Sequence, residues 1–285
     1  MSKNVLIFSN DKPESQDIKM RLVKHLKNAG GLIHEKDIAP DIIVSIGGDG
    51  TLLSTFHKYI EFVDRARFIG IHTGHLGFYA DWQGYEVQEL AQAILESDGE
   101  SISYPLLNIE IDLIDGTHYN QLALNEFSIR AISGTMVSEI YIKDHFFETF
   151  RGDGICVATP TGSTGLNKSL GGAVIHPRLD AIQLTEIASI NNRVFRSLGS
   201  PMIIPRDEWF ELRPHVHSDH KEMIVSIDNM TYSDKIISCV KLSVAQERIH
   251  FARFKHTHFW DRVKHSFIGI NDNDSMDKNP NNYLK

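Results

Sequence analysis

The chain has 285 residues, 41% of them apolar and 23% charged, with a formal net charge of −8. This balance is ordinary for a globular protein long enough for two domains, and the negative charge disfavours a nucleic-acid partner, because binding a phosphate backbone requires a surplus of Lys and Arg. No apolar run approaches the about 18 residues of a membrane span, and the first residues lack the apolar core of a signal peptide. We therefore expect a cytoplasmic protein with no nucleic-acid or membrane partner.

Strands and helices alternate along the first part of the chain. Apolar runs rich in β-branched residues predict strands at residues 4–8, 42–46 and 67–71, and apolar residues at helical spacing predict helices at 14–29, 51–60 and 87–97. This alternation is typical of a three-layer α/β domain with a parallel sheet, which we place at residues 1–102.

Short alternating segments separated by turn residues dominate the next part of the chain. They predict strands within residues 106–114, 121–129, 139–142, 154–159, 210–213, 224–227 and 240–244. One segment, residues 180–188, can form a helix. We therefore expect a β-rich domain at residues 103–252. The end of the chain, residues 271–285, is dense in Asn and Asp and nearly free of apolar side chains, which predicts a disordered tail.

The strongest local signal is a glycine-rich turn between a predicted buried strand and a predicted helix. It contains Gly47, Gly48, Asp49, Gly50 and Thr51. Glycine allows close approach of the backbone, so the amides of this turn and the following helix N-terminus can face a phosphate. An Asp at the centre of the turn is well placed to accept a proton. The alternative is that Asp49 only caps the following helix.

A second glycine-rich stretch, residues 159–172, is dense in Ser and Thr. Its hydroxyls and flexible amides can hold a ribose, a pyrophosphate or both. It is not a P-loop, because the residue before Lys168 is Asn167 and not glycine. An ordinary surface loop is the alternative interpretation.

Two polar residues, Asn125 and Glu126, interrupt the apolar alternation of residues 121–129. Buried polar side chains must be hydrogen-bonded, so either an internal network or a ligand such as a ribose satisfies them. We predict no resident metal site. His72 and His75 have no third ligand nearby, and the histidines of residues 215–220 lie in a polar, turn-like segment.

Taken together, these motifs resemble the NAD kinase family. The resemblance rests on five stretches in this order, residues 47–51, 73–78, 125–126, 153–154 and 159–172, and residues 188–193 look like the Gram-positive bacterial branch. It implies an α/β N-terminal domain, a β-rich NAD-binding domain, and a C-terminal segment, residues 253–270, that returns to the first domain. The site would lie between the two domains.

The resemblance also implies roles for individual residues. Asp49 would take the proton from the 2′-hydroxyl of the adenosine ribose of NAD as the γ-phosphoryl group arrives. Asn125 and Glu126 would hold ribose hydroxyls, and Phe78 would contact the adenine. Gly47, Gly48, Gly50 and Thr51 would bind phosphate. The other implied NAD contacts are Gly50, Arg151, Asp153, Ser163, Thr164, Gly165, Leu166, Asn167, Lys168, Ser169, Ala188 and Asn229.

The implied phosphoryl donor is ATP or polyphosphate with Mg²⁺ or another divalent cation, and the implied assembly is a homodimer or homotetramer. Phosphoryl transfer needs positioning, charge neutralisation and a base on the acceptor hydroxyl, and an Asp of ordinary pKa, about 4, is ionised at neutral pH. Asp153 lies in a similar turn and is the rival base. We favour Asp49 because its turn joins a central strand to a helix N-terminus. Gly165 and Leu166 replace the Ala-Tyr of many family members, so an aromatic contact is absent there.

Two other functions remain open at this point. A lipid or sphingoid kinase shares the glycine-rich turn, although no amphipathic membrane-binding helix is evident and residues 159–172 look specific to NAD kinases. A catalytically silent NAD-binding regulatory module is the second alternative, and the presence of Asp49 argues against it.

Overall fold

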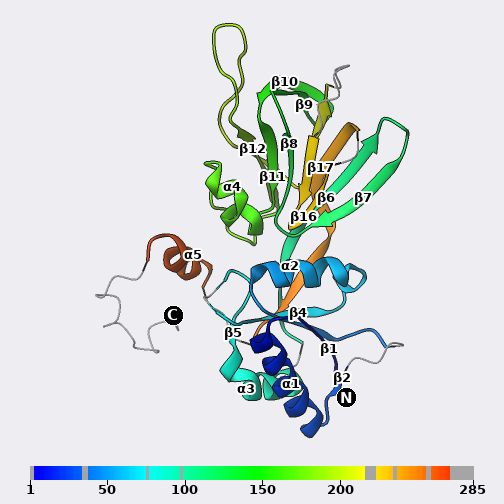
Figure 1. The fold of residues 1–285 in the computed structure, drawn as a ribbon, viewed down its shortest axis with the longest axis vertical. Helices are drawn as coiled ribbons and strands as arrows, with labels where there is room; N and C mark the ends of the chain where they lie inside the picture. Colours follow the sequence, from blue (N-terminus) through cyan, green and yellow to red (C-terminus); the bar gives the residue numbers. More distant parts are fainter. Residues whose placement is uncertain are drawn as a thin grey trace.

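The first part of the chain forms a parallel sheet with helices on both faces (Figure 1). The computed structural model describes residues 3–33, 38–74, 77–96, 99–215, 223–233, 236–254 and 258–269, so the predicted tail at 271–285 lies outside the described residues. The strands are β1 (Asn4–Ser9), β2 (Leu32–Ile33), β3 (Ile42–Ile46), β4 (Arg67–His72) and β5 (Trp82–Gln83). The helices are α1 (Pro13–Asn28), α2 (Asp49–Lys58) and α3 (Val87–Glu96), with short 3-10 turns at Ile60–Phe62 and Gly84–Glu86.

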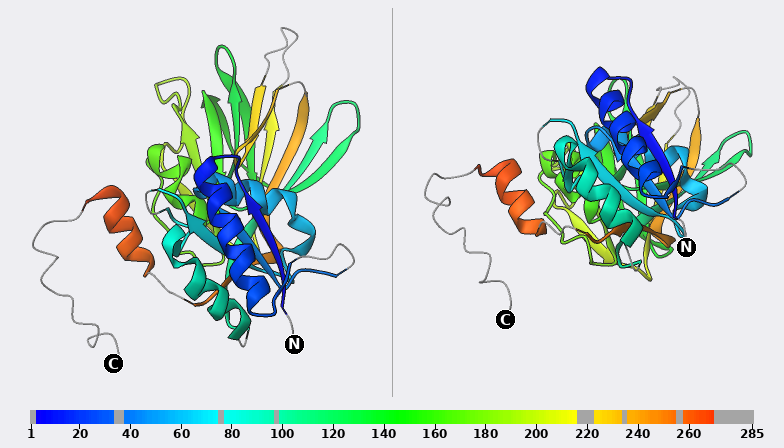
Figure 2. Two further views of the ribbon diagram at one scale, coloured as in Figure 1. Left: turned by 60° about the horizontal axis from the view of Figure 1, so that its bottom comes forward. Right: turned by 90° about the horizontal axis from the view of Figure 1, so that it is seen from below.

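Alternation along the strands decides which helix covers which face. Val44 and Ile46 of β3 pack with Leu22 of α1 and Leu90 of α3 in one core cluster, and α1 and α3 lie side by side on that face (Figure 2). Ile43 points the other way into a second cluster with three apolar side chains of α2: Leu52, Leu53 and Phe56. Successive strand side chains face opposite sides of a sheet, so the fully buried β3 needs a layer of helices on each face.

The second part of the chain is built of antiparallel strands in two packed layers. One layer contains β6 (Ser101–Leu113), β7 (His118–Ala123), β9 (Met136–Ile142), β10 (His145–Gly152), β14 (Trp209–Pro214) and β17 (Ile237–Ala252). The other contains β8 (Glu126–Ala131), β11 (Gly154–Ala158), β12 (Ala181–Ile187), β13 (Met202–Pro205), β15 (Met223–Ile227) and β16 (Met230–Tyr232). A large apolar cluster that includes Phe127, Phe150 and Phe210 fills the space between them.

Strand β17 joins the two halves. It pairs antiparallel with β6 and β14, and near its end it pairs parallel with β4, with Phe251 opposite Phe68. The first sheet therefore runs without interruption from the antiparallel strands into the parallel ones, as 11 strands in all. The expected fold class, an α/β N-terminal domain followed by a β-rich domain, is confirmed.

Two local predictions were wrong. Residues 180–188 do not form a helix, because Ala181–Ile187 is strand β12, in which Ile182 and Leu184 alternate into the core between the sheets. Residues 121–129 are not one strand. The chain leaves the first sheet at the end of β7 and enters the second at β8, and residues 124–126, which we call the 124–126 corner, turn between them.

The last described element is helix α5 (Phe259–Phe267), which follows β17. Its Arg262 is buried, donates hydrogen bonds to the backbone oxygens of Gly77 at 3.1 Å and Phe78 at 2.7 Å, and forms an ion pair with Asp81. The C-terminal helix therefore contacts the loop that follows β4. None of the helices within the described ranges is long and apolar enough to cross a membrane.

Candidate functional site

Asp49 stands in the first turn of α2, just after β3 ends. Its Oδ2 accepts a hydrogen bond from the backbone N–H of Phe78 at 2.9 Å, and its Oδ1 accepts one from Tyr79 at 3.2 Å. The N-cap of α2 is Gly48, and no side chain caps the helix. Asp49 therefore does not cap its own helix. Its carboxylate instead joins the glycine-rich turn to the loop after β4.

The amides of the glycine-rich turn, residues 47–51, are used in two ways. The N–H of Gly47 donates to the carbonyl of Ile71 on β4 at 2.9 Å, and the N–H of Thr51 donates to the carbonyl of Gly48 at 2.9 Å. The amides of residues 48–50 belong to the first turn of α2, where a helix has no carbonyl partners for its own N–H groups. Gly48 and Gly50 are exposed. An anion can therefore reach these amides and the positive end of the helix dipole, whereas Gly47 shapes the turn.

The 124–126 corner is held by one buried carboxylate. Asp228, in the turn between β15 and β16, accepts the backbone N–H of Leu124 at 2.9 Å, of Asn125 at 2.7 Å and of Glu126 at 3.1 Å. These amides have no strand partner, since the chain is changing sheets, and the carboxylate replaces the missing ladder bonds. The corner therefore presents the side chains of Asn125 and Glu126 in a fixed position.

The corner also contacts the Asp49 loop directly. The hydroxyl of Tyr79 donates to the side-chain oxygen of Asn125. Burial, and then the negative charge of Asp49, raise the pKa of Tyr79 well above its ordinary value, so this phenol stays protonated and remains a donor. Asp49 and Asn125 are thus linked through a single residue, because Tyr79 bonds to Asp49 by its backbone and to Asn125 by its side chain.

Glu126 is the second polar residue of the corner, and it is a neutral acid near pH 7. Burial, and then the negative charge of Asp228, raise its pKa from 4.5 to about 8. Its Oε2 is buried and has no hydrogen-bond partner in the part of the chain that the structure describes. A protonated carboxyl can donate one hydrogen bond and accept another, which suits a ligand hydroxyl.

The raised pKa of Glu126 predicts a pH dependence of stability. Between pH 4.5 and about 8 the folded chain keeps a proton on Glu126 that the unfolded chain has lost. The free energy of unfolding should therefore fall as the pH rises through this window. Glu126→Gln cannot ionise, so its Tm relative to the wild type should rise from pH 5 to about pH 8 in thermal melts and then level off. Glu96→Gln, at the exposed end of α3, is the control and should show no such trend. A Tm difference for Glu126→Gln that is constant with pH would contradict the assignment.

Residues 159–172 pack directly onto the corner, as a 3-10 turn (Thr161–Thr164) followed by helix α4 (Leu166–Ser169). The backbone N–H of Thr159 donates to the carbonyl of Asn125 at 2.8 Å, and its hydroxyl donates to the carbonyl of Leu124 at 2.6 Å. A Cβ at Gly162 would lie 2.1 Å from the carbonyl oxygen of Asn125, so this approach requires glycine. The stretch is therefore an ordered wall of the site and not a loose surface loop.

Two residues of the 159–172 stretch that we expected to bind NAD make hydrogen bonds within the protein instead. Ser163 Oγ accepts the N–H of Ile175 at 2.8 Å, and the fully buried Asn167 bonds to backbone oxygens and to the hydroxyl of Thr185 at 2.7 Å. These two side chains shape the wall. The other predicted residues of the stretch are partly or fully exposed: Thr164, Gly165, Leu166, Lys168 and Ser169. Gly165 faces the corner, because a Cβ there would lie 3.2 Å from Glu126 Oε2.

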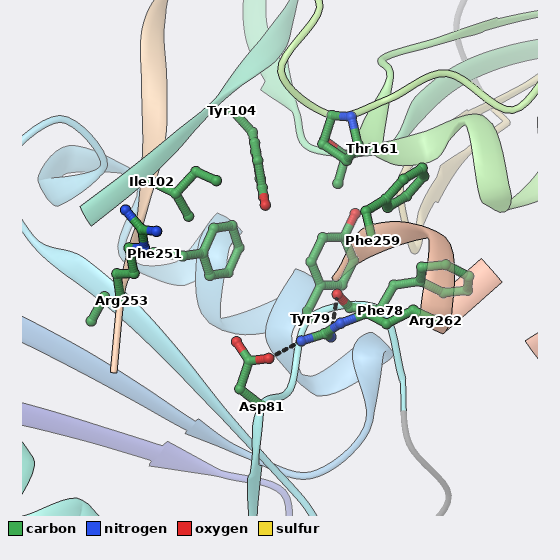
Figure 3. A pocket seen from close by; sticks show the side chains of 12 residues that line it. Phe78, Tyr79, Asp81, Ile102, Tyr104, Thr161, Phe251, Arg253, Phe259 and Arg262 are labelled. Carbon is green, nitrogen blue, oxygen red and sulfur yellow. Dashed lines mark hydrogen bonds and ion pairs between the residues drawn. The ribbon is translucent and has the colours of Figure 1, made fainter. Parts of the chain in front are cut away.

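An aromatic pocket adjoins these groups (Figure 3). It lies between the loop after β4, the start of β6, the end of β17 and helix α5. The residues that line it include Phe78, Tyr79, Tyr104, Thr161, Phe251 and Phe259. Thr161 is buried, and its Oγ1 has no hydrogen-bond partner within the described residues. The pocket therefore combines flat aromatic walls with a buried hydroxyl that is able to bond a ligand, which suits a heteroaromatic ring, and charged side chains such as Asp81 and Arg253 lie along it.

Arg151, Asp153 and Ala188 form a separate group. The N–H of Asp153 donates to the carbonyl of Ile187 at 2.9 Å, and the carbonyl of Arg151 accepts the N–H of Ile190 at 2.7 Å. This group, which we call the distal cluster, lies at the start of β11, whereas Thr159 follows the end of that strand. Six residues of extended chain span about 20 Å. The structure thus does not bring the distal cluster together with Asp49 in one copy of the chain.

Asn229 lies beside α2. Its side-chain amide donates to Ser54 Oγ at 2.9 Å and to the carbonyl of Gly50 at 3.4 Å. It therefore reaches the glycine-rich turn from the second domain and occupies the rim of the same site.

Four residues that build the site were not among the predicted site residues: Tyr79, Thr161, Asp228 and Arg262. Thr161 lies within residues 159–172, whose hydroxyls we expected to bind a ligand, so its role could have been predicted from the sequence. The other three act through contacts to residues far away in the chain, from 30 positions for Tyr79 with Asp49 to 185 for Arg262 with Gly77, and local sequence does not reveal such contacts.

Comparison with known proteins gives consistent matches along the chain. Residues 8–99 match the model of the ATP-NAD kinase N-terminal domain, and residues 124–254 match that of the ATP-NAD kinase C-terminal domain. The NAD kinase of Levilactobacillus brevis is 53% identical over 266 residues, which cover 93% of this chain and 98% of the relative. In fold, the chain resembles yeast NADH kinase complexed with NADH, with a TM-score of 0.78 at 19% identity over 95% of this chain and 88% of that one. It also resembles an NAD kinase from Archaeoglobus fulgidus in complex with ATP, with a TM-score of 0.73 at 22% identity over 94% of this chain and all of that one, 100%.

Proposed function

This chain belongs to the ATP-NAD kinase family, and we propose that its site transfers the γ-phosphoryl group of ATP to the 2′-hydroxyl of the adenosine ribose of NAD, with Asp49 as the general base. As an NAD kinase it is a phosphotransferase. The observation that carries the assignment of Asp49 is its place between the phosphate-facing turn and the 124–126 corner, to which Tyr79 connects it.

The proposed placement of NAD follows from the groups around Asp49. The adenine would enter the aromatic pocket, with Phe78 and the unpartnered hydroxyl of Thr161 as contacts. The ribose would then lie over the 124–126 corner, where Asn125 and the neutral Glu126 can bond its hydroxyls. Asp49 is the carboxylate next to that position. It would accept the proton of the 2′-hydroxyl as the new O–P bond forms.

The donor phosphates would lie on the amides of residues 48–50, with Thr51 in the same helical turn and Gly47 fixing its shape. A divalent cation, which we expect to be Mg²⁺, would supply charge neutralisation on these phosphates. Within the described ranges no group of three or more His, Cys, Asp or Glu side chains could hold an ion. This composition fits a cation that arrives on the donor, since Mg²⁺ at such sites takes most of its ligands from phosphate and water. Polyphosphate would fit the same amides.

We propose that two copies of the chain complete one site, as a homodimer or within a homotetramer. The distal cluster would then contact the part of NAD that extends away from Asp49 of the other copy, with the accessible residues of 164–169 between them. We propose residues 1–102, 103–252 and 253–270 as the limits of the two domains and the returning segment, and a cytoplasmic location.

Mixing two inactive variants tests this assembly. Asp49→Asn and Asp153→Arg should each be inactive alone, because each damages a different part of every site. When they are mixed and allowed to exchange subunits, half of the dimers are mixed, and each of these regains one intact site, so activity should return to about a quarter of the wild type. Recovery is measured as NADP formed per minute. A mixture that stays inactive while native mass spectrometry shows mixed dimers would contradict the shared site.

A coupled assay with ATP, Mg²⁺ and NAD tests the proposed reaction itself. The assay should yield NADP, and ³¹P NMR should place the new phosphate on the adenosine 2′ position. A lipid or sphingoid kinase would leave NAD unchanged and phosphorylate a lipid hydroxyl instead. A silent NAD-binding module would bind NAD without turnover.

A further inference from the structure

A side-chain hydrogen bond joins α2 to the turn between β15 and β16. Nε2 of His57 donates to Oδ2 of Asp228 at 2.7 Å, with the Asp side chain 0% exposed and the His side chain 12% exposed. The two residues are 171 positions apart in the chain. Since Asp228 also accepts the three amides of the 124–126 corner, its carboxylate receives four donors in all, two on each oxygen.

The same turn contacts α2 at a second place, nearer the N-terminus of the helix. Asn229 donates to the carbonyl of Gly50 and to Ser54 Oγ. Gly50, Ser54 and His57 are spaced i, i+4 and i+7, so they lie on one face of the helix. We call the set of His57, Asp228 and Asn229 the clasp. It holds the whole length of α2 against the second domain.

The backbone of Asp228 is adapted to this task. Its φ is +51°, a left-handed conformation that is unfavourable for most residues and tolerated by Asp and Asn. Its own N–H donates to the carbonyl of Glu126 at 2.9 Å, so the turn and the corner are bonded in both directions. Four hydrogen bonds fully satisfy the carboxylate, which is the condition for burying a charge at tolerable cost.

The clasp connects the two parts of the proposed reaction. Asp49 and the phosphate-facing amides lie in the first turn of α2, and Asn125 and Glu126 lie on the corner. We propose that His57 and Asp228 are positioning residues, which set the distance between the Asp49 base and the ribose contacts without touching either substrate. This inference rests on the proposed function. It adds a mechanism that keeps Asp49, on the first domain, at a fixed distance from the ribose hydroxyl that the second domain would hold.

A pair of His57 variants isolates the bond from the packing. Gln keeps an N–H donor at the end of a side chain of similar reach, whereas Leu fills the space without a donor. His57→Gln should keep kcat/KM for NAD within about threefold of the wild type. His57→Leu should lower it by about 10²-fold, since a displacement near 1 Å costs that much in a positioned reaction. The KM for ATP should change little, because the donor amides belong to α2 itself.

The control is a second His–Asp pair. His118 and Asp112 lie 2.8 Å apart on the exposed β6–β7 hairpin, with side chains more than half exposed. His118→Leu should leave all kinetic parameters unchanged. If His57→Leu also keeps the wild-type kcat and KM for NAD, or if Gln and Leu lose activity equally, the positioning role is wrong.

Hydrogen exchange separates this inference from the proposed reaction. The amides of residues 124–126 should exchange faster in His57→Leu than in His57→Gln, without any substrate present. If the wild type fails to phosphorylate NAD, the proposed function is wrong. The hydrogen-exchange result still tests the clasp, because it needs no substrate and no activity. Equal protection of these amides in both variants would overturn the clasp whether or not the enzyme is active.

Discussion

Replacing Asp49 by Asn should lower kcat by about 10²- to 10⁴-fold, because the amide cannot accept the proton of the acceptor hydroxyl and removal of a general base costs rates of this order. Affinity for NAD should change much less. The Asn side-chain oxygen can still accept one of the two loop amides, from Phe78 or Tyr79, while its NH₂ group faces the other. One lost hydrogen bond to a charged group is about 2 kcal/mol, so the loop should loosen without unfolding.

Single-turnover kinetics with saturating ATP and a separate measurement of NAD binding check this prediction. Asp153→Asn is the matched control, because Asp153 is the rival base and lies in a similar turn. That variant should raise KM for NAD and leave kcat nearly unchanged, since we assign Asp153 to binding only. A normal kcat for Asp49→Asn, or a strongly reduced kcat for Asp153→Asn, would contradict the assignment of Asp49 as the base and favour Asp153 instead.

Gly77→Ala should be almost as damaging as removal of the base, although it changes no functional group. A Cβ at position 77 would lie 2.2 Å from Asp49 Oδ1 and 2.6 Å from its Cγ. Either the carboxylate rotates away or the loop moves, and both outcomes break the bonds from Asp49 to Phe78 and Tyr79. We expect kcat to fall about 10²-fold, as for other small displacements of a catalytic group.

The neighbouring glycine supplies the control for Gly77→Ala. A Cβ at Gly74 would meet nothing within 4 Å, so Gly74→Ala should retain wild-type turnover. Circular dichroism and thermal melts should show both variants folded, because Asp49 is at the surface of the site and not in the core. Equal kcat values for the two variants would mean that the Asp49 carboxylate tolerates displacement, which the assignment of a general base does not allow.

The first domain followed closely from the sequence because its apolar residues repeat with clear periods. Residues 42–46 are apolar except for Ser45 and are bounded by Pro and Gly, which left one interpretation, a central parallel strand. The glycine-rich turn after it was recognisable for the same reason. A turn with three glycines has few structural roles, and its place between strand and helix limited them further.

The second domain was less predictable because strand alternation does not reveal which sheet a strand joins. Residues 121–129 alternate as if they were one strand, yet the chain changes sheets at residues 124–126. The reason is a distant carboxylate, Asp228, which bonds the corner amides from about a hundred positions further along the chain. Residues 180–188 were misread because Gln183 and Thr185 break the apolar pattern of β12, while both are in fact buried and bonded to residues 159–172 or the segment after it.

The predicted site residues divide in a way that the sequence alone did not indicate. Asp49, Asn125 and Glu126 meet at one place, whereas the distal cluster lies at the other end of β11. Motif order gives no distance between motifs, so a list of implied NAD contacts cannot distinguish one copy of the chain from two. The structure places the distal cluster away from Asp49 within one copy of the chain, and that separation supports the proposal of a shared site.

The most direct test of the account is a crystal structure of the enzyme with NAD bound, in which the distance from the adenosine 2′-hydroxyl oxygen to each candidate base is measured. We predict that the hydroxyl lies within about 3.2 Å of an Asp49 oxygen, the reach expected of a general base. The same structure should show the adenine in the aromatic pocket beside Phe78 and Thr161, and Asp153 of a second copy further along the dinucleotide. A 2′-hydroxyl bonded to Asp153 and beyond the reach of Asp49 would contradict the assignment.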